Sequence, residues 1–333
     1  MTQETSPYHD LIRSRLRDVL TDARFDELPG FGRGKVRDHY DLGDGRVIMV
    51  ATDRQSAFDQ VLAAVPFKGQ VLTDVARFWF EVTSDIARNH VIEYPDPNVM
   101  VVRKVNMLPV EVVVRDYLTG STSTSIWTMY DKGERCLYDV NFPDGMKKNE
   151  KLPVTILTPT TKGDAGEHDK PITPREILAK GILTAAQWEE LAQTALALFA
   201  RGREMAAKRG LIFVDTKYEF GYDDKGRLTL ADEINTPDSS RYWKADSYAA
   251  RLAEEKEPES LDKEFLRLWI ARHCDPYKDP IPPIPDDTLI EFSGKYIALY
   301  ETMSGKKFQP ASATPPIRDR IWGNIKRYMK DSA

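Results

Sequence analysis

The sequence is poor in cysteine and histidine. Its 333 residues include two cysteines and five histidines. Cys136 and Cys274 lie far apart and match neither a disulfide framework nor the paired-thiol spacing of a metal site. The histidines never recur at i, i+4, so the sequence offers little support for zinc or histidine-triad chemistry. We therefore expect reduced cysteines and a cytoplasmic protein.

The sequence also lacks a long apolar run and a strong excess of positive charge. No stretch of about 18 apolar residues is present, and the first 20 residues have no apolar signal core, so we expect a soluble, untargeted protein without a membrane contact. Lysine and arginine (47) nearly balance aspartate and glutamate (52). This balance argues against a nucleic-acid partner but leaves room for small anionic ligands in a local basic pocket.

A chain of this length with 41% hydrophobic residues can bury a large core and suggests two or three domains. We expect an N-terminal antiparallel-sheet domain over 1–112, a central domain over 113–245 and a helical C-terminal extension over 246–333. The apolar stripes of the extension are expected to pack on the core. A monomer is therefore favoured over a homodimer.

Local patterns predict the main elements. Apolar runs predict strands at VIMVATD, VMVVRKV and VEVVVRDYL, and apolar spacing of three and four residues predicts a helix over 69–90. A further short helix is expected over 7–20. Thr184 and Gln187 form a predicted capping box for a long helix. The segment 121–173 is rich in polar residues, proline and glycine, and we expect an irregular, functional loop there.

The stretch LIFVDTKYEFG begins as a buried strand and then alternates charges. Because side chains of a strand alternate between faces, Asp215, Lys217 and Glu219 share one face. A hairpin turn centred between residues 224 and 225 would place Lys217 opposite Asp232, with Glu219 one diagonal away. Two converging carboxylates suit Mg²⁺. The alternative is a surface ion pair of little energetic weight.

Two other motifs suit phosphate groups, and a third follows a predicted strand. In GFGRGKVRD, glycines allow close backbone approach while Lys35 and Arg37 add positive charge, although a solvated turn is an equal alternative. In VVRDYLTGS, Arg115 and Ser121 can bind phosphate, or the arginine can simply enter solvent. TDRQSAFD either contributes to a site or starts a helix. Together these motifs predict a site for ATP, Mg²⁺ and a second, phosphate-bearing substrate.

The motifs GKVRD, TDRQSAFD, VVRDYLTGS, VDTKYEFG and DEINTPDSSRYW occur in the order in which they occur in one enzyme family. Between about residues 30 and 245 the chain resembles phosphoribosylaminoimidazole-succinocarboxamide synthase, or SAICAR synthetase. The resemblance implies an α+β fold with an ATP-grasp-like two-domain core and a C-terminal helical extension. It also implies ATP-dependent joining of L-aspartate to carboxyaminoimidazole ribonucleotide (CAIR), with release of ADP and phosphate.

The resemblance also implies roles for individual residues. Those expected to bind ATP are Gly34, Lys35, Arg37, Met107 and Glu111, the last two at the adenine. Those expected to bind the other substrates are Ser56, Asp59, Arg115, Ser121, Lys162 and Arg241. The expected Mg²⁺ ligands are Glu219 and Asp232, and the catalytic pair is Lys217 and Asp215, with Asp215 ordering its strand or Lys217. The candidates for binding L-aspartate, left unranked, are Arg241, Lys162 and Lys217.

Two other functions remain open from the residues alone. A small-molecule kinase would also need magnesium, lysine and arginine around a transferring phosphoryl group. A nucleotide-binding regulatory protein would keep the pocket without turnover. Dependence on aspartate separates the ligase from the kinase, and retention of Lys217, Glu219 and Asp232 argues against the regulatory protein.

Overall fold

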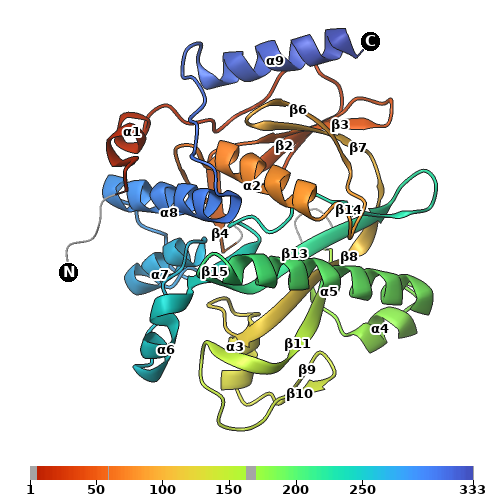
Figure 1. Ribbon diagram of the computed structural model, residues 1–333, viewed down its shortest axis with the longest axis vertical. Coiled ribbons are helices and arrows are strands. Elements are labelled where there is room, and N and C mark those ends of the chain that lie inside the picture. The colour runs from red at the N-terminus through yellow and green to blue at the C-terminus, as the bar shows by residue number, and fades with distance from the viewer. Residues whose placement is uncertain (1–5, 59, 163–169, 333) are drawn as a thin grey trace. The chain divides into compact units, whose positions relative to one another are not determined.

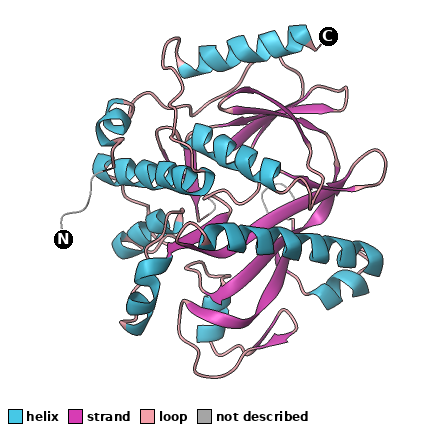
Figure 2. Cartoon of the chain, viewed as in Figure 1, coloured by secondary structure: helices cyan, strands magenta, loops and turns pink. Residues whose placement is uncertain are grey.

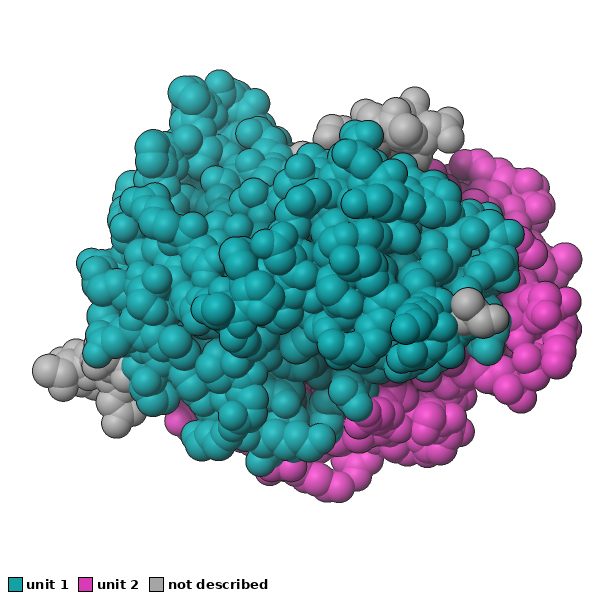
Figure 3. All heavy atoms as spheres, turned by 90° about the horizontal axis from the view of Figure 1, so that it is seen from above, with its two compact units in different colours: residues 1–78, 90–104, 265–333 teal, residues 79–89, 105–264 magenta. Residues whose placement is uncertain are grey.

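The computed structural model describes residues 6–58, 60–162 and 170–332. The chain forms two compact units, which are coloured separately in Figure 3. Their residues are 1–78, 90–104 and 265–333 for unit 1, and 79–89 and 105–264 for unit 2. The division follows spatial contacts, so the C-terminal segment groups with the N-terminal sheet and forms no third unit of its own.

Unit 1 contains a five-stranded antiparallel sheet (Figures 1 and 2). In spatial order the strands are β1 (Phe31–Arg33), β2 (Arg37–Asp41), β3 (Arg46–Ala51), β7 (Val99–Arg103) and β6 (Val91–Asp96). Strands β3 and β7 confirm two of the predicted apolar runs. A separate short hairpin joins β4 (Arg54–Ala57) to β5 (Gln60–Ala64).

The C-terminal helix α9 (Ile317–Asp331) packs on the sheet of unit 1. Its buried side chains join sheet residues in one apolar core, which includes Tyr40, Ile48, Val50, Val99, Val101, Ile321, Ile325 and Tyr328. A polar contact adds to this packing, since Arg320 donates from Nε to Asp96 Oδ2 at 3.0 Å and from Nη2 to Asn98 Oδ1 at 2.7 Å. Burial of the apolar stripe therefore ties the tail to the N-terminal sheet.

The remaining helices of unit 1 are α1 (His9–Ser14), most of α2 (Lys68–Val82), most of α7 (Glu264–His273) and α8 (Asp286–Ser304). Helix α1 is shorter than predicted over 7–20, and α2 ends earlier than predicted over 69–90. None of the helices in the described part of the chain is long and apolar enough to span a bilayer.

Unit 2 is built on a second antiparallel sheet, in which β13 pairs with three other strands. The strands in spatial order are β12 (Lys170–Pro171), β11 (Glu150–Thr161), β8 (Asn106–Leu118), β13 (Leu211–Tyr222) and β14 (Leu228–Ala231). Strand β15 (Ser240–Lys244) also pairs with β13. Strand β8 confirms the apolar run VEVVVRDYL, and β13 confirms the alternating strand.

Strand β11 corrects the expectation of an irregular loop over 121–173. It pairs with β8 over eight residue pairs, from Glu150↔Leu118 to Thr161↔Val110, with an irregularity between Lys151 and Ile156. Prolines at 153 and 159 concealed this strand, because proline cannot donate to the ladder and usually argues against a strand. The same segment also contains α3 (Ile126–Asp131), β9 (Cys136–Leu137) and β10 (Val140–Asn141).

Helix α5 (Ala185–Ala207) packs against β13. Its N-terminus has the predicted capping box, with Thr184 as N-cap and Gln187 at the third position. Gly202 allows the close approach of helix and strand, since a Cβ there would lie 2.6 Å from Cε1 of Phe213. Two shorter helices complete the unit, α4 (Pro174–Ala179) and α6 (Ala245–Ala253).

Candidate active site

The alternating charges of β13 lie beside charged residues of the neighbouring strands. Asp215 is paired with Arg115 on β8 and with Arg241 on β15, and Glu219 is paired with Glu111 on β8. Directly paired residues project to the same face of a sheet. Asp215, Lys217 and Glu219 therefore form a charged row with two arginines at one end and a glutamate at the other.

The opposite face of β13 is held in the interior. Thr216 is fully buried and shares a 2.7 Å hydrogen bond with Ser240, while the hydroxyl of Tyr218 donates to Oδ1 of Asn235 at 2.9 Å. Because Thr216 and Tyr218 are anchored in this way, the strand cannot rotate or slip without exposing buried groups. The interior face thus determines where the charged row points.

One end of the row is a cluster of lysines and carboxylates. Lys217 Nζ donates to Oε1 of Glu111 at 3.0 Å and to Oε1 of Glu219, and Lys162 donates to Oε2 of Glu219. Burial lowers the pKa of Lys217, but the charges of Glu219, Glu111 and Asp232 outweigh burial and raise it well above the ordinary value. Lys217 is therefore held as a cation.

The two glutamates of this cluster differ in protonation. Burial raises the pKa of Glu111 to about 7, with a further rise from the charge of Glu219 opposed by Lys217. Burial also favours the neutral form of Glu219, yet Lys217 and Lys162 hold its pKa well below the usual range. Glu219 is thus a carboxylate at neutral pH, whereas Glu111 is poised to exchange a proton.

Asp232 lies near Lys217, but the predicted strand register was wrong by one residue. The observed pairs are Glu219↔Ala231 and Tyr222↔Leu228, so the turn is centred on Lys225. Asp232 follows the end of β14 and has a φ of 56°, in the left-handed region. Its charge still acts on Lys217. Asp232 is therefore near Lys217, as expected. Its left-handed backbone conformation, and not a strand pair, accounts for this position.

The other end of the row joins two arginines through one aspartate. Oδ2 of Asp215 accepts from Nη1 of Arg115 at 3.1 Å and from Nη1 of Arg241 at 2.7 Å. Glu264 accepts from Nε and Nη2 of Arg241, and Thr158 accepts from Nε of Arg115 at 2.8 Å. Asp215 therefore orients both guanidinium groups, which is a different contact from the expected ordering of Lys217.

The loop after β8 passes close to Arg241 at Gly120 and carries a buried hydroxyl at Ser121. Gly120 has a φ of +118°, and a Cβ there would lie 3.5 Å from Nη2 of Arg241 and 2.4 Å from Cβ of Ser125. Glycine is thus required both by conformation and by space. The Oγ of Ser121 is buried without a partner in the described residues. A buried hydroxyl of this kind suits an anionic ligand.

The glycine loop of unit 1 brings the expected phosphate-binding residues to the start of β2. Lys35 is exposed and Arg37 is half-buried. Gly34 donates from its N–H to the carbonyl of Arg37 at 2.8 Å, and a Cβ on Gly34 would lie 2.9 Å from that oxygen. The tight turn therefore needs glycine at this position.

The other predicted residues lie on several different elements. Ser56 is buried on β4, and Asp59 lies outside the described residues. Met107 is 40% exposed at the start of β8, whereas the carboxylate of Glu111 lies against Lys217. The cluster of Lys217, Glu219 and Glu111 was only partly foreseen, because Glu111 was expected near adenine.

Two further residues of the arginine cluster were missed. Glu264 lies 23 residues after Arg241 and gave no local signal, and Thr158 lies on the proline-containing strand β11. Within the described ranges no group of three or more His, Cys, Asp and Glu side chains is arranged to hold a metal. Two carboxylates are nevertheless sufficient for Mg²⁺, which takes its other ligands from water and phosphates.

The family model for SAICAR synthetase matches residues 30–284. A phosphoribosylaminoimidazole-succinocarboxamide synthase from Legionella pneumophila is 53% identical over 298 residues, covering 89% of this chain and 95% of that protein. Among solved structures, the SAICAR synthase from Saccharomyces cerevisiae complexed with SAICAR is 32% identical with a TM-score of 0.74, covering 87% of this chain and 99% of that one.

A second solved structure is a SAICAR synthetase in complex with ADP, with 26% identity, a TM-score of 0.63 and coverage of 84% of this chain and 99% of that one. The mixed α/β fold with antiparallel sheets matches the fold of these two SAICAR synthases. The chain belongs to the SAICAR synthetase family.

Proposed function

We propose that this protein is the ATP-dependent ligase of purine biosynthesis that joins L-aspartate to the carboxylate of CAIR, giving SAICAR, ADP and phosphate. One observation carries the proposal: a single strand presents a lysine and carboxylate cluster beside a pair of arginines oriented by Asp215. Asp215 and Glu219 are four residues apart, which is roughly 13 Å along a strand. One ribonucleotide can thus place its phosphate at one cluster and its carboxylate at the other.

The reaction needs activation of the carboxylate before the carbon–nitrogen bond forms. The CAIR carboxylate oxygen attacks the terminal phosphorus of ATP, and ADP leaves. The aspartate amine then attacks the acyl carbon, phosphate leaves with the former carboxylate oxygen, and the nitrogen loses a proton. Lys217 is fixed as a cation beside Glu111 and Glu219, so its charge stabilises the negative charge that develops on the activated carboxylate.

The proposed nucleotide site uses an ATP-grasp-like core. The family resemblance assigns Gly34, Lys35 and Arg37 to the phosphate groups of ATP and Met107 to its adenine. The position of the carboxylate of Glu111 against Lys217 favours a role for Glu111 in the activation cluster.

Glu219 and Asp232 would hold Mg²⁺. The donor set fits, because carboxylate oxygen is the ligand that Mg²⁺ prefers and the charges of Glu219 and Asp232 both act on Lys217. When bound, Mg²⁺ would neutralise charge on the ATP phosphates. Lys217 and Lys162 pair with Glu219 in the structure and would exchange part of this contact for substrate anions.

The proposed substrate site takes the CAIR phosphate on Arg115, Arg241 and the buried hydroxyl of Ser121. Ser56 and Asp59 are assigned to the imidazole ribonucleotide. Lys162 is a candidate for a carboxylate of L-aspartate. We further propose a cytoplasmic monomer, in keeping with the two free cysteines, which suit a reducing compartment.

The test measures ADP release from ATP, Mg²⁺ and CAIR with and without L-aspartate, while SAICAR is followed in the same samples. Appearance of ADP and SAICAR together, only with aspartate, supports the ligase. Equal ADP release without aspartate would instead identify a kinase, whose clusters serve only nucleotide and phosphate binding.

A further inference from the structure

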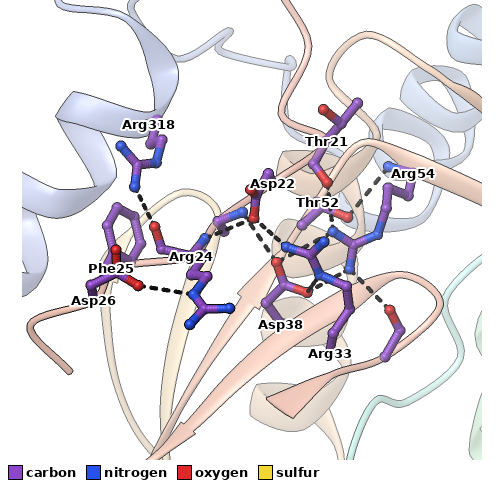
Figure 4. A network of polar contacts seen from close by, with 12 residues as sticks. Thr21, Asp22, Arg24, Phe25, Asp26, Arg33, Asp38, Thr52, Arg54 and Arg318 are labelled. Carbon is purple, nitrogen blue, oxygen red and sulfur yellow. Dashed lines mark hydrogen bonds and ion pairs between the residues drawn. The ribbon is translucent and has the colours of Figure 1, made fainter. Parts of the chain in front are cut away.

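The side chain of Arg54 contacts the backbone of the glycine loop at residues 34 and 35 and is almost wholly buried. It is 6% exposed and faces Asp38, which is fully buried (Figure 4). Nη2 of Arg54 donates to Oδ1 of Asp38 at 2.7 Å and Nη1 donates to Oδ2 at 3.3 Å, so the two side chains form a forked pair. This geometry holds the guanidinium plane in one orientation.

The remaining N–H groups of Arg54 all donate to backbone carbonyls. Nη2 binds the carbonyl of Gly34 at 3.0 Å, Nε binds that of Lys35 at 3.3 Å, and Nη1 binds that of Thr21 at 2.7 Å. A guanidinium has five N–H donors, and all five are thereby used. Arg54 is consequently not available for a ligand, and its contacts act on the loop.

The next carbonyl of the loop is held by a neighbouring residue. Thr52 donates to the carbonyl of Val36 both from its N–H at 3.0 Å and from its hydroxyl. The three consecutive carbonyls of residues 34–36 are therefore bound by Arg54 and Thr52. Each of these peptide bonds is trans, so its N–H points away from its C=O. The N–H groups of Lys35 and Val36 are thus directed away from Arg54.

We propose that Arg54, oriented by Asp38, is a positioning residue that presents the N–H face of the glycine loop to the phosphates of ATP. Successive N–H groups that share a direction form an anion-binding concavity. The inference rests on the proposed function, in which this loop binds ATP. It adds a residue that touches no substrate and acts only through the backbone of residues 34 and 35.

The test compares Arg54→Lys with Arg46→Lys. Lysine at 54 retains a cation beside Asp38 but cannot reach the carbonyls in a fork. Arg46 is a matched control on β3 in the same unit, because its side chain donates to Asp44 and Tyr328. We measure KM for ATP, CAIR and aspartate, the Kd of ADP, and the midpoint of thermal unfolding.

We expect Arg54→Lys to raise both KM for ATP and the Kd of ADP roughly tenfold, as expected for the loss of two hydrogen bonds. KM for CAIR and aspartate should change by less than about twofold, and Arg46→Lys should leave all constants near the parent values. A folded Arg54→Lys protein with unchanged ATP and ADP constants would overturn the proposal. An equal rise in all three KM values would also overturn it, since that indicates general damage.

Two further sets of variants keep the test decisive. Thr52→Val removes the hydroxyl bond to Val36 and should weaken ADP binding about two- to threefold, whereas Thr52→Ser should restore it; equal affinities of these variants count against the proposal. Lys35→Ala tests the underlying assignment of the loop. Unchanged ADP binding in Lys35→Ala refutes the loop as the phosphate site. If Lys35→Ala weakens ADP binding but Arg54→Lys does not, only the positioning role of Arg54 is refuted.

Discussion

Arg54 and Arg115 each face a buried aspartate, but the protein uses their donors differently. Arg54 in unit 1 donates all five of its N–H groups to Asp38 and to three backbone carbonyls. Arg115 in unit 2 donates from Nε to Thr158 and from Nη1 to Asp215, and its Nη2 has no partner in the part of the chain that the structure describes. We call the first network closed, because every N–H of Arg54 has a partner, and the second open, because Nη2 of Arg115 can still bind a ligand.

This difference separates support of the backbone from binding of a ligand. A guanidinium that is saturated by the protein can only hold the groups that it touches, whereas one with a spare N–H can add a phosphate oxygen without losing a bond. The charged row on β13 is open in the same sense, because Glu111, Glu219 and Asp232 share two lysines.

Opening the closed network should cost the most stability. Arg54→Met removes the forked partner of Asp38 and the hydrogen bonds to three backbone carbonyls. Asp38 then keeps the longer contact with Nε of Arg33 at 3.4 Å, so we expect a loss of roughly 3 kcal/mol in the free energy of unfolding. Arg115→Met should cost about 1 kcal/mol, because Asp215 retains Arg241. Urea denaturation of both variants measures the two values. Equal losses would erase the distinction between the closed and open networks.

Within the open row, loss of a charge should affect turnover more than folding. Glu219→Gln removes a proposed Mg²⁺ ligand, and we expect kcat at low Mg²⁺ to fall roughly hundredfold with little change in the unfolding midpoint. The rate is measured as a Mg²⁺ titration. Glu204→Gln, on the surface of α5, is the control and should keep the parent rate. A parent-like Mg²⁺ titration of Glu219→Gln would remove this residue from the metal site.

Asp215 bridges Arg115 and Arg241, and its loss should weaken the binding of one substrate only. Asp215→Asn weakens the orientation of Arg115 and Arg241, so we expect KM for CAIR to rise roughly tenfold while KM for ATP is unchanged. Asp116→Asn is the control, because Asp116 follows Arg115 in the sequence but pairs with Arg203. If KM for ATP rises as much as KM for CAIR in Asp215→Asn, Asp215 does not act through these arginines alone.

The smallest expected effect is a shift in one pKa. Burial and the charge of Glu219 raise the pKa of Glu111 to about 7, whereas Lys217 lowers it. Glu219→Gln removes one raising charge and leaves Lys217 to act on Glu111, so the pKa of Glu111 should fall by about one unit. Carbon-13 NMR of labelled glutamate carboxyl groups measures it. A constant or higher value would show that Glu219 and Glu111 are not coupled.

Local patterns predicted much of the site because they depend on neighbouring residues. The alternation of Asp215, Lys217 and Glu219 follows from the two-residue period of a strand, and the helix start at Thr184 follows from its capping box. The proximity of Asp232 to Lys217 was also predicted, although the register was not. A one-residue change in turn length alters that register, and the sequence does not reveal it.

Contacts between distant segments could not be predicted in this way. Arg115 and Asp215 are 100 residues apart, and the strand that supplies Thr158 contains two prolines. Arg54 was visible in the motif TDRQSAFD, but nothing in that motif shows that its side chain reaches the carbonyls of residues 34 and 35. Such contacts depend on which strands become neighbours.

The sequence by itself determined the charged face of β13, the glycine turn before β2 and the order of the family motifs. Those features arise from strand periodicity and backbone conformation, which are local. Only the tertiary structure decided that Asp215 joins two arginines, that Glu111 meets Lys217 and that Arg54 supports the loop. Burial of the opposite face against the core selects the neighbouring strands and their register, and that selection depends on the whole folded unit.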